Sequence, residues 1–196
     1  VIGGLQGIAQ LNLKRILACS SVLNAGFILL ALAFAANTAV IFYLLVYGVM
    51  TLSITALWMY AGLKTADVDE LSDLQGLGKR APWTAVGLTV TLLSFAGIPL
   101  TAGFVSKFVV IFAVIQNTTA DASLLSLSSA AAALGVGGSL LAAYFYFGMI
   151  RSIWFHEGPS SDLGNAGDRR WNYALVACIA IVVLLVFGVY PAPLLV

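Results

Sequence analysis

The residues with the clearest capacity for chemistry lie in one apolar stretch, residues 93–108 (LSFAGIPLTAGFVSKF). Lys107 is the one charged residue well inside an apolar segment of membrane-spanning length. Pro99 stands between Gly97 and Gly103, and a proline removes a helical N–H and clashes with the carbonyl four residues earlier. We therefore expect this helix to break at Pro99.

A helix break in lipid is tolerated only where protein or water satisfies the freed backbone groups. A buried amine beside such a break favours an ion or proton path. The alternative is a passive, kinked helix from which the stem of Lys107 extends until its amine reaches the lipid headgroups.

The composition identifies the class of protein that must position this stretch. Hydrophobic residues make up 61% of the chain and charged residues 9%, and the mean hydropathy is +1.03. Soluble domains carry about 25% charged residues, so the chain is predicted to be an integral membrane protein. It begins with valine and shows no signal peptide, and we interpret it as a fragment that starts inside a helix.

Apolar segments separated by polar loops predict an all-α polytopic bundle of five transmembrane helices plus the end of a sixth. One segment has 35 residues and would be about 52 Å long if straight, whereas a hydrocarbon core is roughly 30 Å thick. Pro99 lies near its centre and is expected to divide it. The predicted spans are residues 1–9 (partial), 16–36, 39–63, 82–116, 128–154 and 171–190.

The loop charges predict an orientation. Alternating the loops puts eight Lys and Arg residues on one side and none on the other, with Lys107 left over. By the positive-inside rule, the basic loops are cytoplasmic and the C-terminus is outside. The eight are Lys14, Arg15, Lys64, Lys79, Arg80, Arg151, Arg169 and Arg170.

Polar residues inside the spans are candidates for lining a hydrated path to Lys107. They recur at spacings of three and four, which place them on one helix face. For each residue alone, the alternative is an ordinary hydrogen bond between helices. The candidates are Ser20, Ser21 and Asn24 on the first full span, Tyr43, Tyr47 and Thr51 on the second, and Tyr144 on the fourth.

Several other chemistries are not indicated. The chain has no Walker A motif, no GxGxxG after a strand and no HExxH, and its single histidine, His156, is predicted to be a solvated loop residue. Cys19 and Cys178 lie in apolar segments without CxxC spacing, so we expect them to be small buried residues. We therefore predict no metal site and no bound cofactor in this chain, and no nucleic-acid partner.

Three motifs carry a resemblance to a known family. Residues 10–26 (QLNLKRILACSSVLNAG), residues 73–82 (DLQGLGKRAP) and residues 93–108 occur in the order found in the antiporter-like membrane subunits of respiratory complex I. The resemblance spans nearly the whole chain, and the third motif is highly specific. The lysine at position 107 and the short C-terminal end make the chain most similar to the subunit N type, as its C-terminal portion.

The resemblance implies that Lys107 is the terminal proton carrier of a half-channel on a broken helix, near release to the outside. It implies that Lys14 is a candidate relay residue, and it marks Asn24 as a departure, since many relatives have histidine there. The implied partners are other complex I membrane subunits and the lipid bilayer, in a bacterial-type plasma membrane. NADH, FMN, iron–sulfur clusters and quinone are expected on partner subunits.

The expected function is therefore proton translocation driven by quinone reduction elsewhere in an NADH–quinone oxidoreductase. Moving a charge against the membrane potential costs about 2.3 kcal/mol per 100 mV, so such a drive is required. The alternative is a subunit of a multisubunit Na+/H+ antiporter with the same fold. A third possibility is a structural scaffold in which Lys107 carries no proton.

Overall fold

The computed structural model describes residues 1–61, 70–117, 122–156 and 171–190. Within these ranges the regular structure is helical, which confirms the predicted all-α membrane bundle with a helix broken at Pro99. The elements are α1 (Ile2–Ile8), α2 (Leu13–Ala33), α3 (Asn37–Tyr60), the 3-10 helix η1 (Leu71–Leu74), α4 (Leu77–Arg80), α5 (Pro82–Ala96), α6 (Ala102–Gln116), α7 (Ala122–Phe155) and α8 (Trp171–Val189).

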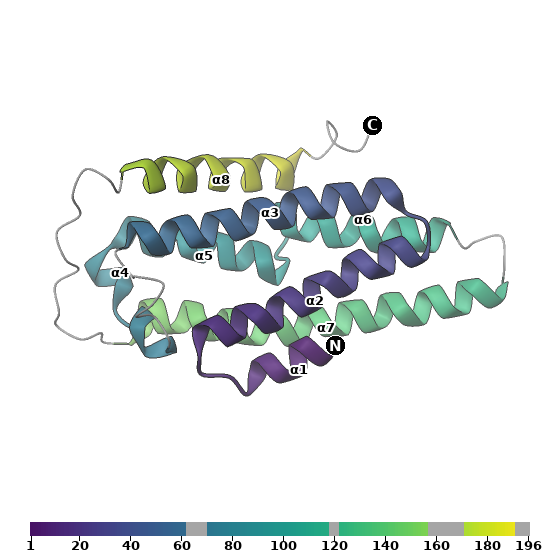
Figure 1. Ribbon diagram of the computed structural model, residues 1–196, viewed down its shortest axis with the longest axis horizontal. Helices are drawn as coiled ribbons and strands as arrows, with labels where there is room; N and C mark the ends of the chain where they lie inside the picture. The colour runs from purple at the N-terminus through teal and green to yellow at the C-terminus, as the bar shows by residue number, and fades with distance from the viewer. Residues whose placement is uncertain (62–69, 118–121, 157–170, 191–196) are drawn as a thin grey trace.

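Four described helices are long and apolar enough to cross a membrane: Leu13–Ala33, Asn37–Tyr60, Ser126–Phe155 and Asn172–Val189. The helices α5 and α6 have 15 residues each, about 22 Å at 1.5 Å per residue, so neither spans a hydrocarbon core alone. They follow one another across the bundle, as Figure 1 shows, and together they form the divided span.

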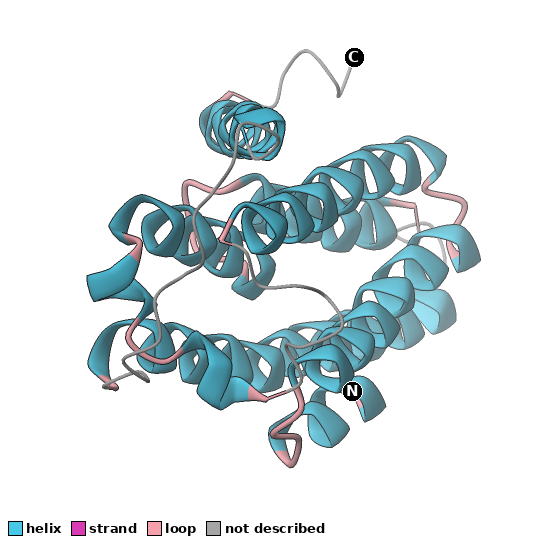
Figure 2. Ribbon diagram, turned by 60° about the vertical axis from the view of Figure 1, so that its left-hand side comes forward, coloured by secondary structure: helices cyan, strands magenta, loops and turns pink. Residues whose placement is uncertain are grey.

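The helices form three layers (Figures 1 and 2). The lowest layer holds α1, α2 and α7, and the middle layer holds α3 with the pair α5 and α6. The outermost helix, α8, packs against α3, α5 and α6. Gly188 allows α8 to lie against the backbone of Leu100 and Thr101, because a Cβ at position 188 would collide with it. The outer helix thus covers the break in the divided span.

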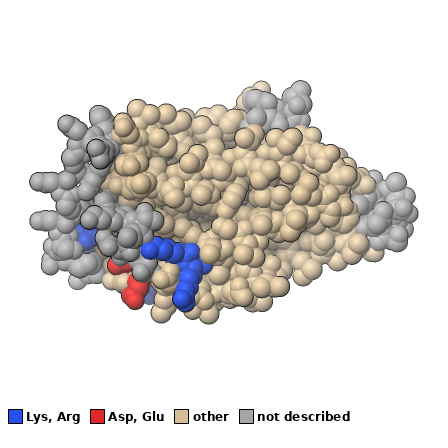
Figure 3. Space-filling model, in the orientation of Figure 1, with Lys and Arg blue, Asp and Glu red and all other residues tan. Residues whose placement is uncertain are grey.

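Apart from the buried Lys107, the described charged residues gather at one end of the bundle, as Figure 3 shows for one face. That end contains the junction between α1 and α2, the segment from η1 to α4, and the end of α7 (Figure 1). The sequence predicts that these basic junctions share one side of the membrane, and the structure brings them to one end of the bundle. The predicted basic residues Lys64, Arg169 and Arg170 lie outside the described residues, as do residues 62–63 of the second predicted span.

Two details differ from the sequence-based expectations. The first full helix begins at Leu13, because the side chain of Asn12 caps it by accepting a hydrogen bond from the N–H of Arg15 (3.1 Å). Cys178, predicted to be buried, is exposed on α8, and Cys19 is only partly buried. An exposed cysteine on this helix is consistent with a lipid-facing surface, where apolar residues need no protein cover.

Candidate functional site

The C-terminal end of α5 is closed by a backbone motif centred on Gly97. Gly97 adopts the left-handed conformation (φ 80°), in which only glycine avoids a Cβ penalty. Its N–H donates to the carbonyl of Ser94 (3.1 Å), and the N–H of Ile98 donates to the carbonyl of Leu93 (3.1 Å). This Schellman arrangement satisfies two of the carbonyls that a helix end leaves free.

The motif provides no backbone N–H for the carbonyl of Phe95. In a continuous helix it would accept from the N–H of residue 99, but Pro99 has no N–H. The amine of Lys107 takes that place, since Nζ donates to the Phe95 carbonyl oxygen at 2.7 Å. The proline that breaks the helix therefore creates the acceptor that holds the lysine.

The surroundings of Lys107 are apolar. Its side chain is 6% exposed, and Nζ lies 5.9 Å from the ring centroid of Phe27, within the range of a cation–π contact. The amine also sits at the C-terminal end of α5, where the helix dipole favours positive charge. Among the described residues, the Phe95 carbonyl, the Phe27 ring and the end of α5 are thus the groups that offset the loss of water around the amine.

Close packing between the two half-helices fixes this geometry. The N–H of Gly103 donates to Ser94 Oγ (3.1 Å), and a Cβ at position 103 would overlap the Ser94 carbonyl. A Cβ at Gly97 would lie 3.3 Å from Lys107 Nζ. Both glycines named from the sequence are therefore required at the break, Gly103 by its close approach to α5 and Gly97 by its left-handed conformation.

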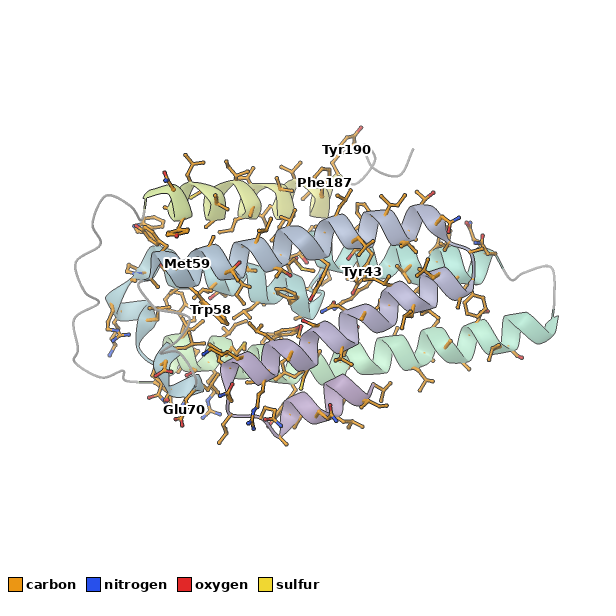
Figure 4. All side chains as sticks on the ribbon, in the orientation of Figure 1. Tyr43, Trp58, Met59, Glu70, Phe187 and Tyr190 are labelled. Atoms are coloured by element: carbon orange, nitrogen blue, oxygen red, sulfur yellow. The ribbon has the colours of Figure 1, made fainter. Side chains whose placement is uncertain are left out.

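A buried chain of polar side chains crosses the bundle next to the break. Tyr146 of α7 hydrogen-bonds to Ser20 of α2, whose hydroxyl lies 3.2 Å from the amide nitrogen of Asn24. The Asn24 amide oxygen accepts from the hydroxyl of Tyr43 of α3 at 2.8 Å. All four side chains are buried, and Figure 4 labels Tyr43 between the ribbons of α2 and α3. We call Tyr146, Ser20, Asn24 and Tyr43 the polar chain.

Two phenylalanines contact both Lys107 and the polar chain. Phe27, which faces the amine, also stacks on Tyr43 with ring centroids 5.7 Å apart. Phe95, whose carbonyl binds the amine, stacks on Tyr146 at the same centroid distance. Proton transfer needs a direct hydrogen bond or a bridging water, so a proton can pass between the polar chain and Lys107 only if water enters beside these rings.

The remaining predicted site residues lie outside this arrangement. Ser21 is exposed and accepts a hydrogen bond from the half-buried Tyr47 (2.9 Å), and the exposed Thr51 donates to the carbonyl of Tyr47. Tyr144 is 66% exposed, and Lys14 is exposed at the start of α2. The structure therefore brings Lys107, Ser20, Asn24 and Tyr43 together. It leaves Ser21, Thr51, Tyr144 and Lys14 exposed on the described residues, while the half-buried Tyr47 packs edge-on against Phe95 (6.2 Å between ring centroids).

The sequence-based prediction of site residues did not include Tyr146, Phe95 or Phe27. Tyr146 is fully buried, yet it lies only two residues from the chosen Tyr144. The part played by Phe95 comes from its backbone carbonyl, and the position of Pro99 four residues later was the available signal. No sequence signal distinguishes Phe27 from the other aromatic residues of the spans.

The bond between Asn24 and Tyr43 yields a stability prediction. Asn24→Leu leaves the buried Tyr43 hydroxyl without its acceptor and is expected to cost about 1–3 kcal/mol of unfolding free energy. Adding Tyr43→Phe removes the orphaned hydroxyl, so the double variant should recover part of that loss. Thermal unfolding of the purified assembly measures both effects, with Tyr144→Phe as the exposed control. A double variant whose loss equals the sum of the single losses would contradict the contact.

Comparisons with known proteins show which proteins this chain resembles. The family profile described as "NADH:quinone oxidoreductase/Mrp antiporter, TM" matches residues 1–134. NADH-quinone oxidoreductase subunit N of Rhodococcus opacus is 37% identical over 97% of this chain and 34% of its own length. The protein of the same name from Geotalea uraniireducens is 32% identical over the whole chain and 40% of its own length. The chain thus spans between a third and two fifths of these relatives.

Solved structures show the same fold. A chain of respiratory complex I from Thermus thermophilus with bound aureothin superposes with a TM-score of 0.75 and 28% identity, over 99% of this chain and 42% of that chain. A chain of the Mrp complex from Dietzia superposes with a TM-score of 0.79 and 25% identity, over 100% of this chain and 43% of that chain. Both comparisons cover the broken helix and Lys107.

Proposed function

The chain belongs to the NADH:quinone oxidoreductase/Mrp antiporter transmembrane family, and from this membership we propose that it is part of a proton-translocating subunit of the subunit N type in an NADH–quinone oxidoreductase. In this proposal residues 1–196 form the C-terminal part of an antiporter-like domain. The observation that carries the proposal is the buried amine of Lys107 on the carbonyl that Pro99 frees.

This geometry supports proton storage and release at Lys107. When protonated, the amine is held by the Phe95 carbonyl and by the negative end of α5. When water enters beside Phe27 or Phe95, the amine gains a partner that can accept its proton. The polar chain supplies hydroxyl and amide groups that can hold such water in place. The entry of water beside Phe27 and Phe95 then controls proton movement at this site.

The energy for this movement must come from outside the chain. Transfer of one proton against 100 mV costs about 2.3 kcal/mol. In this proposal the residues of this chain carry out no redox step. We propose that partner subunits carry the NADH, FMN, iron–sulfur and quinone chemistry and change the hydration or charge near Lys107. Lys14, exposed where α2 begins, remains a proposed relay residue on the charged side of the membrane.

The orientation is part of the proposal. Apart from Lys107, the described basic residues lie at one end of the bundle, and an excess of Lys and Arg favours the cytoplasmic side. Lys107 lies in the half-helix α6, which runs from the middle of the bundle to the opposite end (Figure 1). Protons that reach Lys107 are accordingly proposed to leave towards the outside of a bacterial-type plasma membrane.

A subunit of a multisubunit Na+/H+ antiporter is the second candidate, favoured by the superposition on the Mrp complex chain. The two functions share the fold and the buried lysine, but they differ in the source of energy. The names of the most similar relatives favour the oxidoreductase.

Purification of the native assembly separates these two functions. The full-length protein, tagged in its host, is expected to co-purify with an activity that reduces quinone with NADH and acidifies vesicles. Addition of Na+ should not be needed for that proton movement. An assembly that lacks NADH oxidation but exchanges Na+ for protons would show that the antiporter assignment is the correct one.

A further inference from the structure

We propose that a groove at the charged end of the bundle binds one anionic phospholipid, with its phosphate on Arg151 and an acyl chain along α7 and α1. Two adjoining cavities, of about 400 and 430 Å³, share Leu11, Leu71, Gly148 and Arg151 and therefore form one groove. This binding site is independent of the proton-transport role.

The two halves of the groove differ in chemistry. One half is lined by polar side chains from η1 and the end of α7, namely Glu70, Ser72, Gln75, Ser152 and His156. Figure 4 labels Glu70 at this charged end of the bundle. The other half is lined mainly by apolar groups from α1 and α7, namely Gly7, Ile8, Phe145, Phe147 and Tyr144. A ligand that fills both halves must have a polar head and an apolar tail.

Arg151 lies where the two halves meet. It is exposed, and its guanidinium makes no hydrogen bond or ion pair with any residue that the structure describes. The acidic residue of the lining, Glu70, is already engaged, since its carboxylate caps η1 and accepts from Ser72 Oγ (3.2 Å). The planar donors of Arg151 are thus available for a phosphate group.

The position of the groove fits a lipid. Arg151 lies one turn before the end of α7 at Phe155, which is the depth of the headgroups if α7 spans the bilayer. Gly148 forms part of the floor, and a Cβ there would meet nothing within 4 Å. Ser152 donates to the carbonyl of Leu71 (2.8 Å) and so fixes η1 against α7 as a wall of the groove. A free phosphate ion would leave the apolar half unused.

The test measures lipid retention by the purified native assembly, exchanged into detergent with phosphatidylglycerol or phosphatidylcholine and weighed by native mass spectrometry. Arg151→Gln is expected to weaken retention of one phosphatidylglycerol by about fivefold. Gly148→Leu, which fills the floor, should weaken it as well. Arg15→Gln removes the same charge from the same end, outside the groove lining, and should leave retention unchanged.

Four results would overturn the proposal. Equal retention by the Arg151→Gln and Arg15→Gln variants would show that Arg151 binds no headgroup. Equal retention of phosphatidylcholine, or displacement by millimolar glycerol 3-phosphate, would indicate an apolar surface or a free-anion site instead. Cross-linking of a Gly148→Cys variant to a neighbouring protein chain would show that protein fills the groove.

Discussion

Replacing Lys107 by methionine is expected to abolish most of the proton transfer through this subunit while the assembly still forms. Methionine keeps a flexible apolar stem but provides no amine to carry a proton. Removal of a positioned proton-transfer group slows the step that uses it on the order of 100-fold. The rate of vesicle acidification by the whole assembly should therefore fall by the share that this subunit carries.

Two further variants identify the property of Lys107 that matters. Lys107→Arg keeps a positive charge and donors for the Phe95 carbonyl, but arginine does not release its proton in proteins. A proton carrier therefore predicts that arginine fails as methionine does. Lys79→Met removes an exposed lysine of α4 and should leave acidification unchanged. A normal rate in Lys107→Met would support the scaffold role instead.

Gly103→Ala is expected to damage the site through the backbone. The new Cβ would overlap the carbonyl of Ser94, so α6 must move away from α5. Overpacking of this kind costs about 1–3 kcal/mol, and here it also separates Lys107 from the Phe95 carbonyl. Both the melting temperature of the assembly and its proton translocation should fall.

Gly48→Ala provides the matched control. Gly48 lies within α3, and a Cβ there meets nothing within 4 Å. Alanine has the better helix propensity by about 1 kcal/mol, so this variant should be neutral or more stable. If Gly103→Ala behaves like Gly48→Ala in melting and in transport, the close contact between the two half-helices does not exist as described.

The sequence was sufficient to predict the helix break at Pro99 and to single out Lys107 as the charged residue beside it. The 35-residue apolar segment is too long for one straight span, and Pro99 at its centre indicates where it must divide. Because a proline has no N–H for the carbonyl four residues earlier, Pro99 also identifies the Phe95 carbonyl as the freed acceptor. What the sequence could not show is which donor takes that carbonyl, because this depends on how the start of α6 is placed against the end of α5.

The polar residues were harder to assign because α3 and α7 are apolar on all sides, so hydropathy does not reveal the inward face. Tyr43, Tyr47 and Thr51 recur every four residues, but each such step rotates by about 40° around the helix. Tyr43 is therefore buried, Tyr47 half-buried and Thr51 exposed. Tyr144 and Tyr146 are two residues apart, which is a rotation of about 200° around the helix, so only Tyr146 faces the polar chain.

The central claim is that Lys107 carries protons, and the number of protons translocated per NADH oxidised tests it most directly. This ratio does not depend on how much assembly is present. Reconstituted assemblies with wild-type Lys107 and with Lys107→Met are compared in sealed vesicles. We predict that the methionine variant translocates fewer protons per NADH. An undiminished ratio would contradict the assignment of Lys107 as the proton carrier.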